Sequence, residues 1–232
     1  MKRLALILIG ASVNALSPAA QAQTTSGVSI AGTIAALLLP EKPKAAIILL
    51  AGGDGAIGVN SDGSIRRQGN QLVRTRAAYA RQGFAVLVPD GTIDVKAAVD
   101  FMRRYGKVTL VGTSRGTQRA ARGIARGAAP DRLVLTAGFL SDASGDSDNV
   151  MNILGSPARL PPTLVVHHRN DACRKTLPAG VAPFLSWAKG KAQVAWLDGG
   201  TATGHPCQAR GHHGFNGLDG TVVGAVAKFA SP

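Results

Sequence analysis

From residue 45 onward, the chain alternates between short apolar runs and longer segments whose apolar residues recur at helical spacing. This alternation is typical of crossover units built around a mostly parallel sheet. The runs are almost continuously apolar, which predicts strands buried on both faces. They are AAIILL (45–50), FAVLV (84–88), KVTLVG (107–112), RLVLTAGF (132–139), TLVVHH (163–168) and QVAWL (193–197).

Five segments between and after these runs have the periodicity of helices that would cover the sheet. They span residues 70–82, 94–105, 115–127, 181–190 and 221–230. Earlier apolar runs at 27–32 and 33–40 predict an antiparallel hairpin at the sheet edge, while 141–149 and 199–214 predict loops. A length of 232 residues, with no repeat or linker, suits a single α/β domain with helices on both faces of the sheet.

The N-terminus has the features of a secretory signal peptide. Lys2 and Arg3 precede the apolar run LALILIGASVNAL, and Ala20-Gln21-Ala22 has the small residues of a cleavage site. A membrane anchor is the alternative, but the run is shorter than the roughly 20 residues that a span requires. We expect a signal peptide at 1–22, edge strands at 23–44 and the main domain at 45–232. The mature protein would then be periplasmic or secreted, with no stable membrane span.

The chain is strongly basic, with a formal net charge of +13, of which Lys2 and Arg3 contribute two positive charges. No dense Lys/Arg run is interleaved with aromatic residues, and export argues against a nucleic-acid partner. An anionic cell envelope or small acidic ligands fit the charge better. Solubility alone is the simpler explanation.

The two cysteines, Cys173 and Cys207, predict a disulfide because an exported protein enters an oxidising compartment. Two buried free thiols are the alternative. Neither cysteine has the neighbours of a zinc site, and the sequence predicts neither a metal nor a cofactor.

The stretch AGGDGAIG contains Gly53, Gly55 and Gly58 in the pattern G-x-G-x-x-G directly after an apolar run. A nucleotide-dependent oxidoreductase is one interpretation, with Asp90 as the ribose-binding acid. A pyrophosphate loop must open a helix at once, but residues 59–69 are polar and rich in helix breakers. Asp90 also lies 37 residues beyond Gly53, where about 20 are expected. We therefore disfavour nucleotide binding.

A second glycine motif carries a serine. Gly112-Thr113-Ser114-Arg115-Gly116 is a G-x-S-x-G between a β-rich run and a helical segment, which is the context of a nucleophile elbow. A serine nucleophile needs a histidine to accept its proton and an acid to orient that histidine.

Candidates for both partners follow in the chain order serine, acid, histidine. Asp171 comes just after the run at 163–168 and is favoured over Asp142 and Asp198. The loop after the run at 193–197 carries His212 and His213, with His205 as a further candidate. His167 and His168 end a strand and are interpreted as packed or hydrogen-bonded side chains.

With these motifs, residues 45–229 resemble a small α/β-hydrolase, closest in size to the dienelactone-hydrolase-like and minimal serine esterase members. In that family the histidine often stands in H-G-F or H-G-Y before the last helix, which matches His213-Gly214-Phe215 and favours His213. The early glycine loop and the residue after the serine supply oxyanion donors. The usual H-G-G-G is replaced by A-G-G-D-G, so the donors are Arg115 together with either Gly53 or Asp54.

The resemblance implies an exported serine hydrolase of the carboxylesterase kind, which forms an acyl-enzyme through Ser114, His213 and Asp171. The absence of a long insertion implies no large lid and a small-molecule acyl substrate. A disulfide between Cys173 and Cys207 would tie the acid loop to the histidine loop. A non-catalytic binding protein with the same fold is the alternative function.

Four arginines recur along the helix predicted to follow the serine: Arg115, Arg119, Arg122 and Arg126. One interpretation is a solvated helix face. The other is that Arg115 projects toward the pocket and favours substrates bearing a carboxylate or phosphate.

Overall fold

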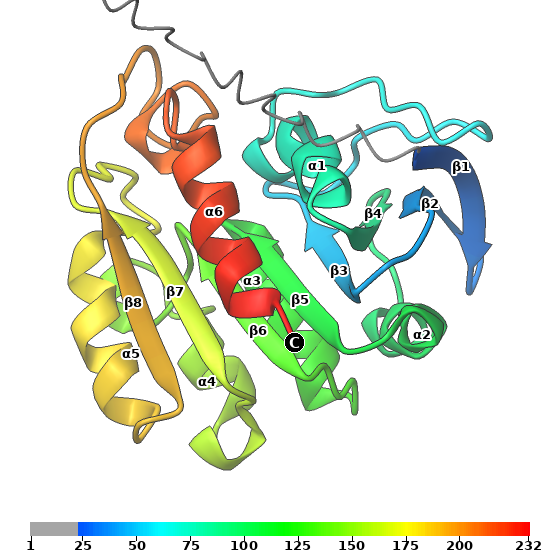
Figure 1. Ribbon diagram of the computed structural model, residues 1–232. Coiled ribbons are helices and arrows are strands. Elements are labelled where there is room, and N and C mark those ends of the chain that lie inside the picture. The colour runs from blue at the N-terminus through cyan, green and yellow to red at the C-terminus, as the bar shows by residue number, and fades with distance from the viewer. Residues whose placement is uncertain (1–22) are drawn as a thin grey trace, which may run out of the picture.

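The computed structural model describes residues 23–232, which form an eight-stranded sheet with helices on both faces (Figure 1). The predicted signal peptide lies outside the described residues. The strand order is β1-β2-β4-β3-β5-β6-β7-β8, and the pairing is parallel from β4 through β8. The strands are β1 (Gln23–Ile30), β2 (Thr33–Pro40), β3 (Ala45–Leu50), β4 (Phe84–Pro89), β5 (Val108–Thr113), β6 (Arg132–Thr136), β7 (Thr163–His168) and β8 (Ala192–Leu197).

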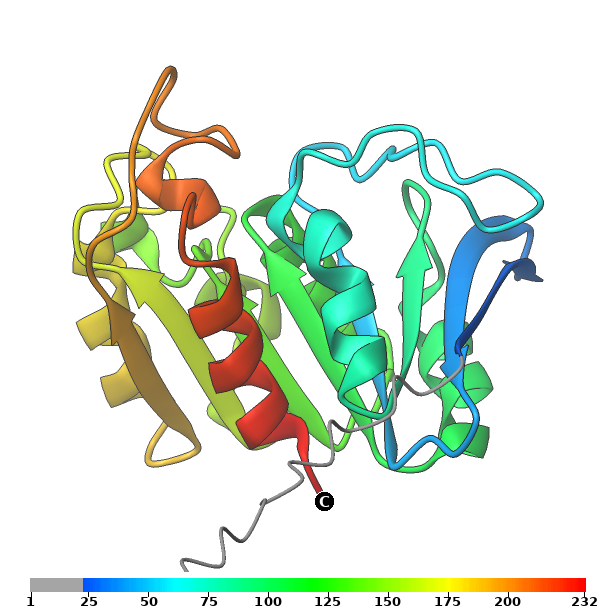
Figure 2. The same cartoon turned by 45° about the horizontal axis from the view of Figure 1, so that its top comes forward.

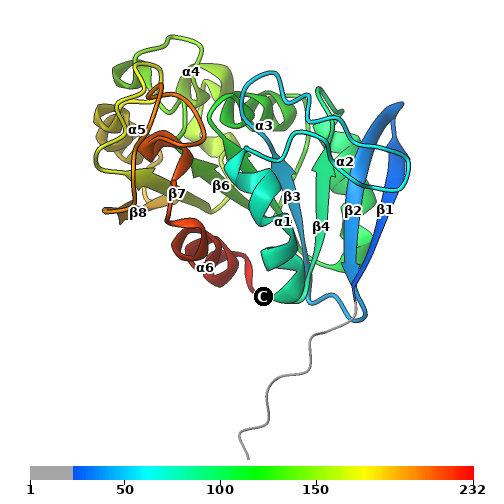
Figure 3. The ribbon, with the colours of Figure 1, turned by 90° about the horizontal axis from the view of Figure 1, so that it is seen from above.

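The helices form two layers, which Figure 3 shows from above. Helices α1 and α6 lie side by side on one face of the sheet, and α2, α3, α4 and α5 cover the other. Each layer packs its apolar side against the sheet and forms one hydrophobic core. The helices are α1 (Gln71–Arg81), α2 (Val95–Met102), α3 (Arg115–Ala125), α4 (Val150–Leu154), α5 (Val181–Trp187) and α6 (Asp219–Ala230).

The prediction of a mostly parallel sheet with helices on both faces is confirmed. Strands β3, β4, β5 and β7 are buried along their whole length. The prediction that every run is buried on both faces is wrong for β8, which is only partly buried because it is an edge strand. The short helix α4 was not predicted, since five residues are too few to show a helical period.

The α-helices of residues 23–232 pack on the faces of the sheet, and none forms a lid over the carboxyl ends of the strands. None of these helices is both long enough and apolar enough to cross a membrane.

The turn between β5 and α3 brings two backbones into close contact. Ser114 adopts φ 51° and ψ −125°, a left-handed conformation that side-chain-bearing residues rarely take. A Cβ on Gly116 would lie 2.2 Å from the carbonyl oxygen of Leu50, and one on Gly112 would lie 2.5 Å from the carbonyl oxygen of Gly116. The buried Thr117 hydroxyl donates to the Ser114 carbonyl (2.6 Å) and accepts from the Phe139 N–H (3.1 Å). Gly116 is therefore required for α3 to start this close to β3, and Gly112 for the tight turn from β5 into α3.

The long loop 51–70 rises above the carboxyl end of the sheet, as does loop 198–211 (Figure 2). The carboxylate of Asp90, which follows β4, holds the first of these loops. It accepts hydrogen bonds from the N–H groups of Ile57 (2.7 Å), Gly58 (3.1 Å) and Val59 (2.9 Å). No helix opens at Gly58, since α1 begins at Gln71. Asp90 therefore binds the glycine loop itself, and the loop lacks the helix start that pyrophosphate binding requires.

Burial raises the pKa of Asp90, whereas the three N–H bonds and the nearby charge of Arg66 lower it more, and the pKa lies below its usual value. The carboxylate form is therefore the one that the folded loop stabilises.

We predict that Gly116→Ala lowers the free energy of unfolding by about 2–3 kcal/mol, because the new methyl group meets main-chain atoms that cannot rotate away. Gly224→Ala in the exposed face of α6 is the matched control. A Cβ there meets nothing within 4 Å, so stability should hold or rise by up to about 1 kcal/mol. Urea denaturation of both variants measures the difference, and equal stabilities would contradict the close contact.

We predict that Asp90→Asn lowers the free energy of unfolding by about 1–3 kcal/mol at pH 7, because a charged acceptor of three N–H bonds is lost. The folded pKa lies below the unfolded value of about 3.9, so the contribution is fully present above that value and is lost as the pH falls through the folded pKa. The difference between wild type and variant should therefore narrow below pH 4. Denaturation curves from pH 7 to 3 test this, with the exposed Asp100→Asn as control. A gap that stays constant across this range would show that the charge is not responsible.

Candidate active site

Ser114 lies where β5 turns into α3, at the carboxyl edge of the sheet. Its side chain lines a small cavity of about 70 Å³. His213 lines the same cavity from the short helix His212–Gly214, between β8 and α6. The strained turn thus presents the serine hydroxyl to a hollow that it shares with a histidine.

Asp171 and His213 form a buried pair. Asp171 follows β7 in the loop that leaves the sheet, and its Oδ2 lies 3.0 Å from Nδ1 of His213. Asp171 is only 2% exposed and His213 only 5%. The other carboxylate oxygen accepts the Cys173 N–H at 2.9 Å. Because Nδ1 of His213 is engaged by the carboxylate, Nε2 is the ring nitrogen left for Ser114.

No hydrogen bond joins the Ser114 hydroxyl to His213 among residues 23–232. The two residues share the cavity without contacting each other at hydrogen-bond distance. In unliganded active sites such bonds are often long and tighten only when substrate binds.

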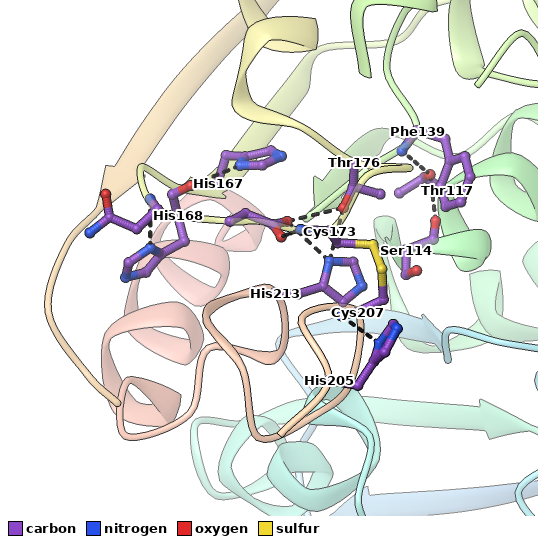
Figure 4. Close-up of polar contacts among 12 residues, drawn as sticks. Ser114, Thr117, Phe139, His167, His168, Cys173, Thr176, His205, Cys207 and His213 are labelled. Atoms are coloured by element: carbon purple, nitrogen blue, oxygen red, sulfur yellow. Dashed lines mark hydrogen bonds and ion pairs between the residues drawn. A yellow bond between two sulfur atoms is a disulfide. The ribbon is translucent and has the colours of Figure 1, made fainter. Parts of the chain in front are cut away.

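Thr176, which was not predicted, contacts both members of the buried pair. Its hydroxyl lies 3.0 Å from Asp171 Oδ2 and 2.9 Å from His213 Nδ1, as Figure 4 shows for Thr176 and His213. The hydroxyl donates to the carboxylate and can share the imidazole N–H. Thr176 is completely buried. No motif marks a threonine five residues after the acid, so only the fold of the loop reveals it.

The rival histidines are engaged elsewhere. The His212 ring stacks on His168 with centroids 4.2 Å apart, and the His205 ring accepts the Cys207 N–H. His168 also contacts the Gly199 carbonyl at 2.9 Å. His167 is fully buried against the sheet, and burial lowers its pKa. None of these four side chains lines the cavity of Ser114.

The rival acids also have other partners. Asp142 accepts bonds from the side-chain amides of Asn149 and Asn152, both at 2.7 Å. Asp198 pairs with Arg169 at 3.1 Å. Asp171 is therefore the one of the three candidate acids that contacts His213.

Cys173 and Cys207 form a disulfide that joins the loop after β7 to the loop after β8. Cys173 is two residues beyond Asp171, and Cys207 lines the cavity with Ser114 and His213 (Figure 4). On the chain-entropy model, closing this loop of 34 residues contributes roughly 3–4 kcal/mol to stability. The bond therefore restrains the two loops that carry the acid and the histidine.

Gly52 and Gly53 line the cavity of Ser114, whereas Asp54 does not. The Gly53 carbonyl accepts a hydrogen bond from the Arg119 guanidinium at 2.9 Å, and the Ala51 carbonyl accepts another. Among residues 23–232, the N–H groups of Gly53 and Arg115 donate to no other group. Of the two candidate donors in the glycine loop, Gly53 is therefore the one that lines the cavity of Ser114.

Known structures of similar shape were found, although no protein-family model and no curated protein sequence matches the chain. The chain is similar to a dienelactone hydrolase from Anabaena variabilis (TM-score 0.63, 14% identity, 90% of this chain and 96% of that one). It is similar to an esterase from Pyrococcus furiosus (TM-score 0.61, 14% identity, 94% of each chain). A serine hydrolase without a lid from Xanthomonas campestris is a third match (TM-score 0.56, 18% identity, 92% of this chain and 98% of that one).

These likenesses extend over nine-tenths of the chain and agree with the strand order and the two helical layers described above. Residues 23–232 have the α/β-hydrolase fold, with no helix over the carboxyl ends of the strands.

Proposed function

We propose that the protein is an exported serine hydrolase that cleaves an ester or a related acyl bond through an acyl-enzyme. The observation that carries the proposal is the buried Asp171–His213 pair, which opens on the cavity that holds the strained Ser114. Structures of similar fold bear the names of esterases and serine hydrolases, which supports this class of reaction. The Cys173–Cys207 disulfide supports export, because such bonds persist in oxidising compartments.

The reaction begins when the Ser114 hydroxyl attacks the acyl carbon and its proton passes to Nε2 of His213. Asp171 holds the imidazole in the tautomer that carries the Nδ1 proton and stabilises the imidazolium that forms. The negative charge on the former carbonyl oxygen is accepted by the N–H groups of Gly53 and Arg115, at the positive end of the α3 dipole.

Collapse of the tetrahedral intermediate breaks the acyl–oxygen bond, and His213 protonates the departing alcohol. A water molecule then attacks the acyl-enzyme while His213 accepts its proton, which releases the acid and restores Ser114. The cavity of about 70 Å³ holds little more than the reacting group. Short acyl esters are therefore the best first substrates.

We predict that Ser114→Ala and His213→Ala each abolish nearly all hydrolysis, because the nucleophile and its base act as a unit. His212→Ala is the matched control and should retain most activity, since His212 stacks on His168 away from the cavity. Hydrolysis of 4-nitrophenyl acetate and labelling by a fluorophosphonate probe measure the effect. Loss of hydrolysis in His212→Ala together with full hydrolysis in His213→Ala would reverse the assignment of the base. Failure of the wild type to label would favour a non-catalytic binding protein.

We predict that Asp171→Asn lowers kcat by about three to four orders of magnitude with a smaller change in KM, because an amide cannot hold the productive tautomer. Asp142→Asn is the control, since the Asp142 carboxylate accepts hydrogen bonds from the side-chain amides of Asn149 and Asn152. Steady-state kinetics on the folded variants distinguishes the two. Full turnover in Asp171→Asn would assign the role of the acid to another carboxylate.

A further inference from the structure

A second and much larger cavity, of about 480 Å³, adjoins the small cavity of Ser114. We call it the arginine cavity because Arg115, Arg119, Arg122 and Arg126 of α3 line it. The two cavities share Gly53 as a common wall, and Arg115 is the residue directly after Ser114. Since the small cavity holds only the reacting group, the rest of a substrate has to extend beyond it, and the arginine cavity is next to it.

The positive charge of the arginine cavity is only partly neutralised. Arg122 pairs with Asp148 at 2.6 Å, and Lys175 pairs with Asp146 at 3.0 Å, so two of the three lining aspartates already have cationic partners. The third lining aspartate, Asp54, has its carboxylate bound to the N–H of Ala56.

Three arginines remain without a carboxylate partner. Arg115 and Arg126 form no ion pair among residues 23–232. The Arg119 guanidinium is half-buried and donates to the main-chain carbonyls of Ala51 and Gly53, which carry no charge to offset its own. The residues that line the cavity carry four positive and three negative charges, a surplus of one positive charge. Asp54 and Asp146 lie near enough to Arg119 and Arg115 to act on them through their charge, without forming an ion pair with either.

Arg119 is affected by burial and by its charged neighbours. Burial lowers the pKa of this guanidinium most; the charge of Asp54 raises it, and the positive charges of Arg115 and Arg122 lower it. Arginine stays protonated in proteins, so the repulsion is relieved by an anion rather than by loss of a proton. The arginine stripe lines an open hollow of ligand size.

We propose that the arginine cavity binds a carboxylate or phosphate group carried by the substrate, with Arg115 as the residue that sets this specificity. The inference rests on the proposed hydrolase function and names the substrate class of that site. The Arg115 side chain binds the anionic group of the substrate, while its backbone N–H donates a hydrogen bond to the oxyanion. Arg126 contributes at the far end of the same helix face, and Arg119 holds the shared wall through Gly53.

Two pairs of esters test the proposal and locate the anion. In the first pair the acyl part differs: the mono-4-nitrophenyl ester of glutaric acid against 4-nitrophenyl pentanoate. In the second pair the alcohol part differs: the acetyl ester of 3-hydroxybenzoate against that of 3-hydroxybenzamide. The quantity measured is the ratio of kcat/KM between the anionic and the neutral member of each pair.

The wild type should prefer the anionic member of at least one pair, and Arg115→Gln should lower that ratio about tenfold to a hundredfold, mainly through KM. Arg126→Gln should lower it less. Glutamine keeps the backbone N–H at position 115, so the ratio reports on the side chain alone. Raising the ionic strength should reduce the preference of the wild type.

The matched control is Arg81→Gln, an equal change of charge on the exposed C-terminal turn of α1. This turn leads into the amino end of β4, whereas Ser114 follows the carboxyl end of β5. The ratio of Arg81→Gln should equal that of the wild type. Ratios that are the same in wild type, Arg115→Gln and Arg81→Gln would overturn the proposal, and so would an equal fall in both variants.

A binding measurement separates failure of the inference from failure of the proposed function. Glutarate and inorganic phosphate are titrated by calorimetry into Ser114→Ala and into Ser114→Ala/Arg115→Gln, where no hydrolysis takes place. Binding that is lost with Arg115→Gln supports the anion site even if the wild type hydrolyses none of the esters, a result that would reject the hydrolase alone. No binding together with hydrolysis of neutral esters at unchanged ratio would reject the anion site alone.

Discussion

The close approach of α3 to β3 at Gly116 is the constraint on which the site depends. Because the Gly116 Cα faces the Leu50 carbonyl without a side chain between them, α3 can begin immediately at the end of β5. The turn must then pass through a left-handed residue, and that residue is Ser114. Thr117 and the neighbouring strand hold the strained turn in place through the Ser114 carbonyl and N–H. One steric contact thus decides where the hydroxyl stands and where the helix dipole points.

The remaining parts of the site are loops at the same edge of the sheet, and each is held by a specific bond. Asp90 fastens loop 51–70, and Arg119 fixes the carbonyls at its start. The Cys173–Cys207 disulfide joins the acid loop to the histidine loop, and Thr176 bridges the two side chains. These bonds restrain segments that would otherwise be the most mobile in the fold, which is how an accurate arrangement can be built on loops.

The sequence predicted the sheet, most of the helices and the identity of the candidate residues, because each leaves a local signal. The G-x-S-x-G between a strand and a helix is such a signal, and so is the chain order of serine, acid and histidine. Thr176 was not predicted, and neither was the bond from Arg119 to the Gly53 carbonyl, because contacts with His213 and Gly53 join residues far apart in the chain. Asp90 carried a misleading local signal. Its position after a strand fits a ribose-binding acid, but in the structure its carboxylate binds the glycine loop.

By itself, the sequence determined most of the elements, since apolar periodicity depends only on neighbours along the chain. It also determined which residue types were available for chemistry. The tertiary structure alone decided which of them meet. His212 and His213 are adjacent and carry the same imidazole side chain. The structure pairs His213 with Asp171 and stacks His212 on His168. It also formed an open hollow along the arginines of α3, which along the sequence are only a periodic stripe. The physical reason is that burial, pairing and cavity shape arise from segments separated by many residues, whose relative positions are fixed only when the sheet is assembled.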